Sequence, residues 1–269
     1  MIKNEMWKLN NGVEMPAIGI GTFQATKESL VLALQSGYRH IDIAPIYGNE
    51  KEVGEAIAES KVPRSELFLS VKIWNESMRT GKIREAVESS LKNLNTDYLD
   101  LLLYHWPVKE KYLETWKEME KLYKEGVVRA IGVSNTTPRQ LEEIKKIAEV
   151  KPVVDQIEMH PHFTQQDVVD YCKENDIIIQ TWSPLGRGAY VADPTLTEIG
   201  KNYGKTAAQV VLKWNMQRGC CVLPKASSKE RLYENADLFD FTLSEEDMNR
   251  INAMNNGIRT ESDPENFDF

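Results

Sequence analysis

The chain has 269 residues, with 33 Lys or Arg against 41 Asp or Glu, so its net charge at pH 7 is -8. This length accommodates a single α/β domain, and an acidic chain without a basic cluster argues against a nucleic-acid partner. Three cysteines, no apolar run near the roughly 20 residues that span a bilayer and no secretory signal predict a reduced cytoplasmic protein without a membrane partner.

A β-hairpin is predicted first, because the turn Asn10-Asn11-Gly12 separates two short runs and Asn-Gly is a strong hairpin signal. The apolar run 17–21 follows. Its two glycines form a G-x-G without the third glycine of a dinucleotide fingerprint, so this motif alone indicates no Rossmann fold.

Short apolar runs then alternate with amphipathic segments almost to the end of the chain, and such alternation is typical of a parallel sheet. The predicted strands are 17–21, 40–42, 67–72, 98–103, 130–133, 153–157, 177–182 and 220–223. The predicted helices are 27–36, 50–60, 83–94, 113–125, 139–148, 165–174, 207–217 and 228–235. Eight such pairs over 1–269 predict a single (β/α)8 TIM barrel domain, with a doubly wound open sheet as the alternative. An extra C-terminal helix at 243–253 and an irregular tail at 257–269 complete the prediction.

Polar residues stand at the ends of the predicted strands, where a barrel of this type carries its chemistry. Asp42, Lys72 and His105 end the second, third and fourth strands, and Tyr47 lies in the turn after the second. Taken singly, Asp42 and Lys72 could be a structural ion pair and His105 a packing residue. Together they form a constellation that suits proton donation to a carbonyl oxygen.

The predicted role of Tyr47 depends on its neighbours. A phenol has a pKa of about 10, and an ammonium about 4 Å away would favour phenolate by up to about 4 kcal/mol, or roughly three pKa units. Lys72 could act in this way while Asp42 keeps it charged, and His105 would then orient the substrate. No metal site is predicted, because the close pair His160 and His162 is separated by a proline and has no third ligand nearby.

The chain resembles the aldo-keto reductases along nearly its whole length. The motifs that carry the resemblance are GYRHID with YGNE (37–42 and 47–50), VKIWN (71–75), DYLDLLLYHWP (97–107), GVSN (132–135), DQIEMHP (155–161), WSPLG (182–186) and LPKASSKERLYEN (223–235). The resemblance implies an NADPH-dependent carbonyl reductase in which Tyr47 is the acid, Asp42 and Lys72 tune it and His105 orients the carbonyl.

The resemblance also implies a cofactor across the barrel mouth, bound by Thr22, Asp42, Ser134, Asn135, Gln156, Trp182, Ser183, Leu185, Lys225, Ser227, Arg231, Glu234 and Asn235. Trp182, where relatives more often carry Tyr or Phe, would stack on the nicotinamide. Lys225, Ser227 and Arg231 would face the 2'-phosphate, a role also suggested by two cations at the start of a helix, although a solvated basic turn is the alternative. Ala226 stands where a serine is frequent, so NADH remains a second, less favoured cofactor.

Four residues are predicted to bind the substrate: Phe23, Trp74, His105 and Trp106. The short tail suggests an open site that accepts small aldehydes, 2-oxoaldehydes or keto-sugar acids, and a monomer is expected. The alternative is a catalytically weak NADP(H)-binding barrel with a regulatory or structural role. Retention of all four catalytic positions favours the enzyme.

Overall fold

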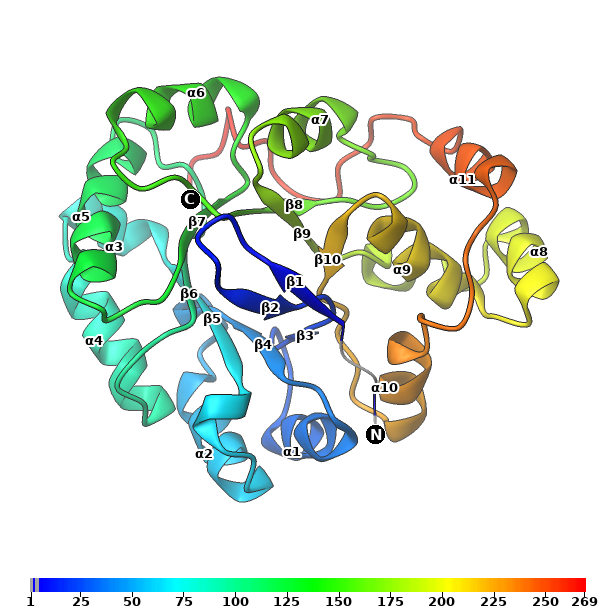
Figure 1. Cartoon of the computed structure of the whole chain (residues 1–269), viewed down its shortest axis with the longest axis horizontal. Coiled ribbons are helices and arrows are strands. Elements are labelled where there is room, and N and C mark those ends of the chain that lie inside the picture. The colour runs from blue at the N-terminus through cyan, green and yellow to red at the C-terminus, as the bar shows by residue number, and fades with distance from the viewer. Residues whose placement is uncertain (1, 3–4) are drawn as a thin grey trace.

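Eight parallel strands curl into a barrel at the centre of the structure, a computed structural model that describes residues 2 and 5–269 (Figure 1). The strands lie side by side in chain order: β3(Ile20–Gly21), β4(His40–Ile43), β5(Phe68–Ile73), β6(Leu101–Tyr104), β7(Ile131–Ser134), β8(Val154–Glu158), β9(Ile178–Trp182) and β10(Cys220–Val222). Backbone hydrogen bonds from Gly19 N to Val222 O (2.9 Å) and from Val222 N to Ala17 O (3.1 Å) close the sheet. The predicted (β/α)8 fold is confirmed.

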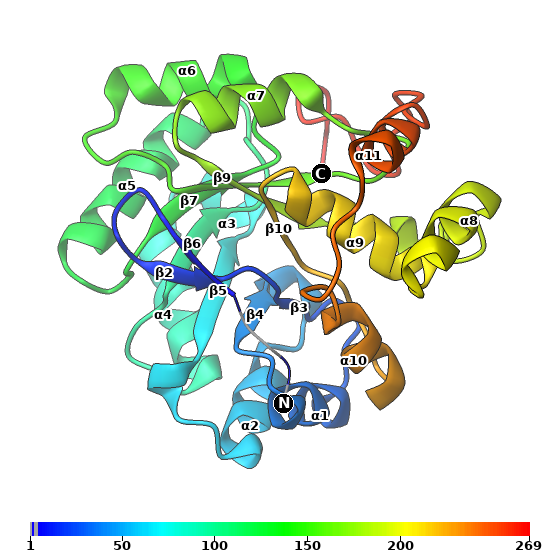
Figure 2. The same ribbon diagram turned by 45° about the vertical axis from the view of Figure 1, so that its right-hand side comes forward.

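A ring of helices surrounds the barrel and connects successive strands (Figures 1 and 2). The crossover helices are α1(Lys27–Ser36), α2(Glu50–Ser60), α4(Ile83–Leu94), α5(Tyr112–Lys124), α6(Pro138–Ile147), α7(Gln166–Glu174), α9(Ala207–Gln217) and α10(Lys229–Ala236). Thr26, Thr137 and Thr206 each cap a helix through a capping box, which explains why α1 and α9 begin at the predicted residue and α6 one residue before it. The predicted extra helix is α11(Glu245–Asn252), capped by Ser244.

Two further helices, α3(Asn75–Thr80) and α8(Pro194–Tyr203), were not expected from the sequence. The single helical stretch of α3 is too short for an apolar period to be recognised. For α8 the signals were present, because Asp193 caps the helix and Pro194 occupies its first position. The helix lies outside the crossover ring, beside α9 (Figure 2).

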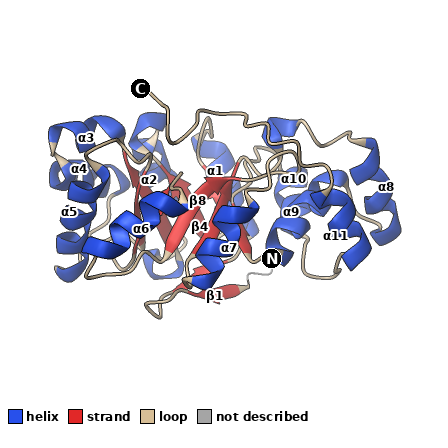
Figure 3. Cartoon of the chain, turned by 90° about the horizontal axis from the view of Figure 1, so that it is seen from above, coloured by secondary structure: helices blue, strands red, loops and turns tan. Residues whose placement is uncertain are grey.

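The two ends of the barrel differ in character. The hairpin of β1(Met6–Lys8) and β2(Glu14–Pro16) covers one end, as the Asn-Gly turn predicts, and an apolar cluster that includes Leu9, Met15 and Leu103 fills the barrel above it. The irregular tail after α11 crosses the opposite end (Figure 3). Polar side chains at the carboxyl ends of the strands therefore collect beneath the tail.

Candidate active site

A buried ion pair joins two neighbouring strands at the mouth of the barrel. Asp42 on β4 and Lys72 on β5 are both buried, and Lys72 Nζ lies 2.6 Å from Asp42 Oδ2. Burial alone would lower the pKa of Lys72, but the attraction of Asp42 and Tyr47 outweighs it and raises the pKa. Lys72 is therefore a charged ammonium inside the protein, as the proposed tuning of Tyr47 requires.

Tyr47 ends η1(Pro45–Tyr47), the turn that follows β4, and is half-buried. Lys72 Nζ lies 5.4 Å from the centroid of its ring. The rings of Phe23 and His105 stand 5.2 Å and 6.0 Å from it, both edge to face. Burial is the largest influence and raises the pKa of Tyr47, while the charge of Lys72 opposes it. Before a substrate binds, Tyr47 is thus a protonated phenol that can donate.

His105 follows β6 directly and contacts two aromatic rings, because the centroid of the Trp74 ring lies 5.2 Å from that of His105 in addition to the Tyr47 contact. Burial, and after it the charge of Lys72, holds the pKa of His105 well below its ordinary value. The imidazole is therefore neutral at physiological pH. Its Nδ1 is buried and has no hydrogen-bond partner among the described residues. A neutral ring suits a hydrogen bond to a carbonyl better than a cation that would itself compete as the acid.

The carboxylate of Asp42 is held on its second oxygen as well. Gln156 Nε2 on β8 donates to Asp42 Oδ1 at 2.8 Å and to Gln180 Oε1 at 2.9 Å. Thr22 Oγ1 donates to the Asp42 carbonyl at 2.8 Å. The sequence suggested Gln156 and Thr22 only as cofactor contacts, whereas here both also fix Asp42. Gln180, in the middle of β9, had given no signal of its own.

Three residues expected near a nicotinamide form one hydrogen-bonded group. Ser134 Oγ, at the end of β7, donates to Gln156 O at 2.8 Å. Asn135 adopts φ +56°, which asparagine tolerates, and its Nδ2 donates to His105 O at 3.0 Å. Trp182 Nε1 donates to Asn135 Oδ1 at 2.9 Å. A Phe at position 182 could not make this bond, so the Trp both presents a ring and orients Asn135.

Basic residues gather at the start of α10. Lys225, Ser227 and Arg231 are exposed there, and the side chain of Ser228 caps the helix. Among the described residues, neither Lys225 nor Arg231 forms an ion pair. Further along α10, Glu234 accepts a hydrogen bond from Thr206 Oγ1, and Asn235 is buried. Ser183 and Leu185 lie in the turn after β9, where Ser183 has φ +46°. Unpaired cations at a helix start suit a phosphate group.

The tail packs on the aromatic residues predicted to bind the substrate. The rings of Trp74 and Phe269 are stacked, with centroids 6.0 Å apart and an interplanar angle of 11°. The centroid of the Trp106 ring lies 5.3 Å from the ring centroids of both Phe267 and Phe269. The sequence predicts a short tail that leaves the mouth open, and this expectation is wrong on the Trp74 side. The signal was the repeated Phe of Asn266-Phe267-Asp268-Phe269 in an otherwise polar segment.

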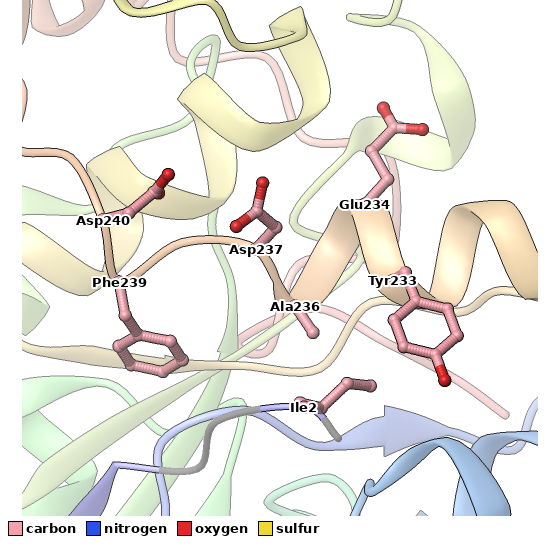
Figure 4. Close-up of a pocket in the computed structure, with 7 residues that line it drawn as sticks. All are labelled: Ile2, Tyr233, Glu234, Ala236, Asp237, Phe239 and Asp240. Carbon is pink, nitrogen blue, oxygen red and sulfur yellow. The ribbon is translucent and has the colours of Figure 1, made fainter.

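A hollow of about 520 Å³ lies elsewhere, at the end of α10 (Figure 4). Ile2, Ala236 and Phe239 form its apolar side, and Figure 4 shows the Glu234 carboxylate directed away from Ile2. Lys205 already pairs with Asp237 and Asp240 at its edge. The hollow contains none of the four predicted catalytic residues, and we assign it no chemistry. Within the described chain no cluster of three or more His, Cys, Asp or Glu could hold a metal, and no helix is long and apolar enough to cross a membrane.

Comparison with known proteins gives matches over nearly the whole chain. A model described as "Aldo/keto reductase family" matches residues 17–256. The chain is 48% identical over 267 residues to glyoxal reductase of Bacillus subtilis (strain 168), covering 97% of both chains. It is also 38% identical over 285 residues to morphine 6-dehydrogenase of Pseudomonas putida, covering 99% of this chain and 96% of the other.

Solved structures give the same result. The crystal structure of an aldo-keto reductase enzyme from a Medee basin deep-sea metagenome library matches with a TM-score of 0.94 and 42% identity, covering 98% of this chain and all of the other. An aldo-keto reductase of the silkworm Bombyx mori, complexed with NADPH, matches with a TM-score of 0.92 and 35% identity, covering 97% of this chain and 91% of the other.

Proposed function

The chain belongs to the aldo/keto reductase family of oxidoreductases, and from this premise we propose that it reduces small aldehydes and ketones with NADPH, with Tyr47 as the general acid. One observation supports the assignment most strongly. The Asp42–Lys72 ion pair, 2.6 Å long and buried, lies beside the ring of a tyrosine that also neighbours His105. No other tyrosine of the described chain is placed against a buried ammonium.

Proton transfer is the part of the reaction that these side chains supply. As a carbonyl carbon accepts hydride, negative charge develops on its oxygen, and a neutral His105 can donate a hydrogen bond to that atom. Tyr47 then gives its proton to the oxygen. The phenolate that remains is stabilised by the charge of Lys72. Asp42 holds Lys72 in place, and Gln156 in turn holds Asp42. The raised pKa of Tyr47 keeps the donor protonated before reaction.

A bound NADPH would supply the hydride, and the residues around the mouth fit it. Trp182 is half-buried, so part of its ring is accessible for stacking. Asn135 and Ser134 offer amide and hydroxyl groups for a carboxamide, and Gln156 retains its amide oxygen because its nitrogen is already bonded to Asp42 and Gln180. Asp42 and Thr22 would border the nicotinamide end.

The other end of the cofactor would lie along the turns after β9 and β10. Ser183 and Leu185 would bind the pyrophosphate, and Glu234 and Asn235 the adenine. The 2'-phosphate would be bound by Lys225, Ser227 and Arg231. The unpaired charges of Lys225 and Arg231 suit its double negative charge. This set supports NADPH over NADH. We further propose that residues 1–269 act as one domain, of which residues 1, 3 and 4 lie outside the described part.

Small substrates are supported by the aromatic surroundings of the site. Trp74 lies against His105, and the exposed ring of Phe23 lies against Tyr47. The tail stacks on Trp74 and packs on Trp106, which is buried, and so narrows this apolar space. Among the relatives, the Bacillus protein named for glyoxal acts on a small dicarbonyl. We therefore favour 2-oxoaldehydes and other small aldehydes, with keto-sugar acids as a further class.

The function is tested by following NADPH absorbance with methylglyoxal, 4-nitrobenzaldehyde and a keto-sugar acid. The expected result is oxidation of NADPH with every small aldehyde and kcat/KM values in the range of about 10⁴ M⁻¹s⁻¹ or more for the preferred one. Tight NADPH binding without oxidation across a broad carbonyl panel would contradict the proposal and indicate a binding protein instead.

A further inference from the structure

A chain of buried hydrogen bonds connects the turn after β9 to the C-terminal tail. Glu158 ends β8, and His160 lies two residues later, both almost fully buried. His160 Nε2 lies 2.9 Å from Glu158 Oε1, and His160 Nδ1 lies 2.8 Å from the hydroxyl of Tyr190. The same Glu158 oxygen accepts from Thr260 N and Thr260 Oγ1, each at 2.6 Å.

The protonation of this chain follows from its partners. Burial would raise the pKa of Glu158, but hydrogen bonds from His160 and Thr260 outweigh it and lower the pKa. Glu158 is then a carboxylate and can only accept, so His160 Nε2 carries a proton. On the other side of the ring, His160 Nδ1 is hydrogen-bonded to the hydroxyl of Tyr190, whose pKa burial raises.

At one end of the chain lies the turn that follows β9. The ring of Tyr190 packs directly under η3(Gly186–Gly188), because any Cβ at Gly186 would collide with it. That turn begins at Ser183 and Leu185, the residues proposed for the pyrophosphate. Contact with the Tyr190 ring therefore holds this turn in position.

At the other end lies the tail. Thr260 is exposed apart from its bonds to Glu158, and the next residue, Glu261, forms an ion pair with Arg187 of the β9 turn. Beyond it, Glu265 accepts from Thr137 at 2.8 Å and from Arg139 at 2.6 Å. The tail then reaches Trp74 and Trp106 through its two Phe rings.

We propose that His160 is a positioning residue, which through Tyr190 and Glu158 couples the turn over the cofactor (183–193) to the tail over the substrate aromatics (256–269). Ordering of one segment favours ordering of the other, and by thermodynamic reciprocity the coupling is the same in both directions. Occupation of the cofactor site therefore tightens the tail. This part rests on the proposed function; the link between the two segments does not.

The test is hydrogen–deuterium exchange of the full chain, with and without NADPH. Tyr190→Phe removes the bond to His160 and keeps the ring under Gly186. Without NADPH it should speed exchange of the Thr260 amide by about fivefold, the factor that one hydrogen bond corresponds to. Tyr171→Phe is the matched control, since it likewise removes one side-chain hydrogen bond of a tyrosine hydroxyl, to Glu142 Oε1 at 2.6 Å on the outer helices.

The reverse direction uses the tail. Thr260→Val removes one bond to Glu158 and should speed exchange across residues 186–193, where Ala189, Val191 and Asp193 carry bonded amides. Unchanged exchange of the opposite segment in both variants would overturn the coupling, and so would an equal change in the Tyr171→Phe control.

NADPH supplies the second arm. In the unsubstituted protein and the Tyr171→Phe control, NADPH should slow exchange in both the turn (183–193) and the tail (256–269). In Tyr190→Phe, NADPH should slow exchange in the turn alone. If NADPH protects neither segment of the unsubstituted protein while Tyr190→Phe still loosens Thr260 without it, the link is supported and the cofactor proposal fails. If NADPH protects the tail equally in Tyr190→Phe, transmission through His160 is contradicted.

Discussion

At the scale of single residues, the site depends on the buried positive charge of the Lys72 ammonium. Lys72 is 1% exposed, and its only carboxylate partner in the described chain is Asp42. Such a pair contributes little net stability against its desolvation, but removing one partner leaves an uncompensated buried charge. Gln156 and Thr22 then hold an Asp42 that has lost its counter-ion.

Lys72→Met should therefore lower the free energy of unfolding by about 3–5 kcal/mol, because Asp42 remains buried and unpaired. The double variant Asp42→Asn with Lys72→Met should regain most of that loss, since no charge is then buried. Urea unfolding followed by circular dichroism measures both. Equal destabilisation by the single and double variants would show that packing, and not charge, is what Lys72 contributes.

The pH dependence of reduction follows from the two shifted residues. The acid must be protonated to act, and the pKa of Tyr47 is raised, so protonated Tyr47 persists above the usual phenol value of about 10. The pKa of His105 is lowered, so the ring stays neutral through the neutral range. The rate of the hydride-transfer step should be flat between about pH 6 and pH 9. A midpoint near pH 7 in single-turnover measurements would contradict both assignments.

At the scale of elements, α10 begins in a cluster of free cations. Arg231 and Lys225 are exposed, and neither is paired within the described residues. A charge-assisted hydrogen bond to a phosphate contributes about 1.5–3 kcal/mol, and a cofactor without the 2'-phosphate cannot use it. If Lys225 and Arg231 bind the 2'-phosphate as proposed, the start of α10 discriminates between NADPH and NADH.

Arg231→Ala should weaken NADPH binding by roughly 10- to 100-fold and change NADH binding by less than about threefold. Quenching of tryptophan fluorescence reports both dissociation constants. Arg84→Ala, which removes an exposed arginine paired with Glu125 on another face, is the control and should alter neither. An equal loss for both cofactors would mean that this helix start does not read the 2'-phosphate.

Elements of the barrel were predictable where local signals agreed. Asn-Gly indicated the hairpin. The helices predicted at 139–148 and 243–253 start at residues that favour a helix start, Thr137 with Pro138 for α6 and Ser244 for α11. The side-chain hydrogen bonds of the site could not be predicted, because they join residues distant in sequence. Gln156 bonds Asp42 across 114 positions, and Thr260 bonds Glu158 across 102. Spacing along the chain carries no information on such pairs.

At the scale of the whole molecule, closure of the sheet is what assembles the site. Asp42, Lys72 and His105 come from three successive strands, and Gln156 reaches Asp42 across the barrel interior. Their identities and order could be predicted from strand ends alone, since parallel strands present their carboxyl ends at one mouth. The position of the tail over Trp74 could not, because an irregular segment has no period to read.

The central claim, that Tyr47 donates the proton, is tested most directly by Tyr47→Phe. The substitution keeps the ring between Phe23 and His105 and removes only the hydroxyl. NADPH affinity should stay within about twofold, while kcat/KM for methylglyoxal falls by roughly 10²- to 10⁴-fold, the usual contribution of a positioned general acid. Tyr203→Phe, whose hydroxyl bonds Asp247 away from the mouth, should retain full turnover. Turnover by Tyr47→Phe equal to that of the unsubstituted protein would contradict the account.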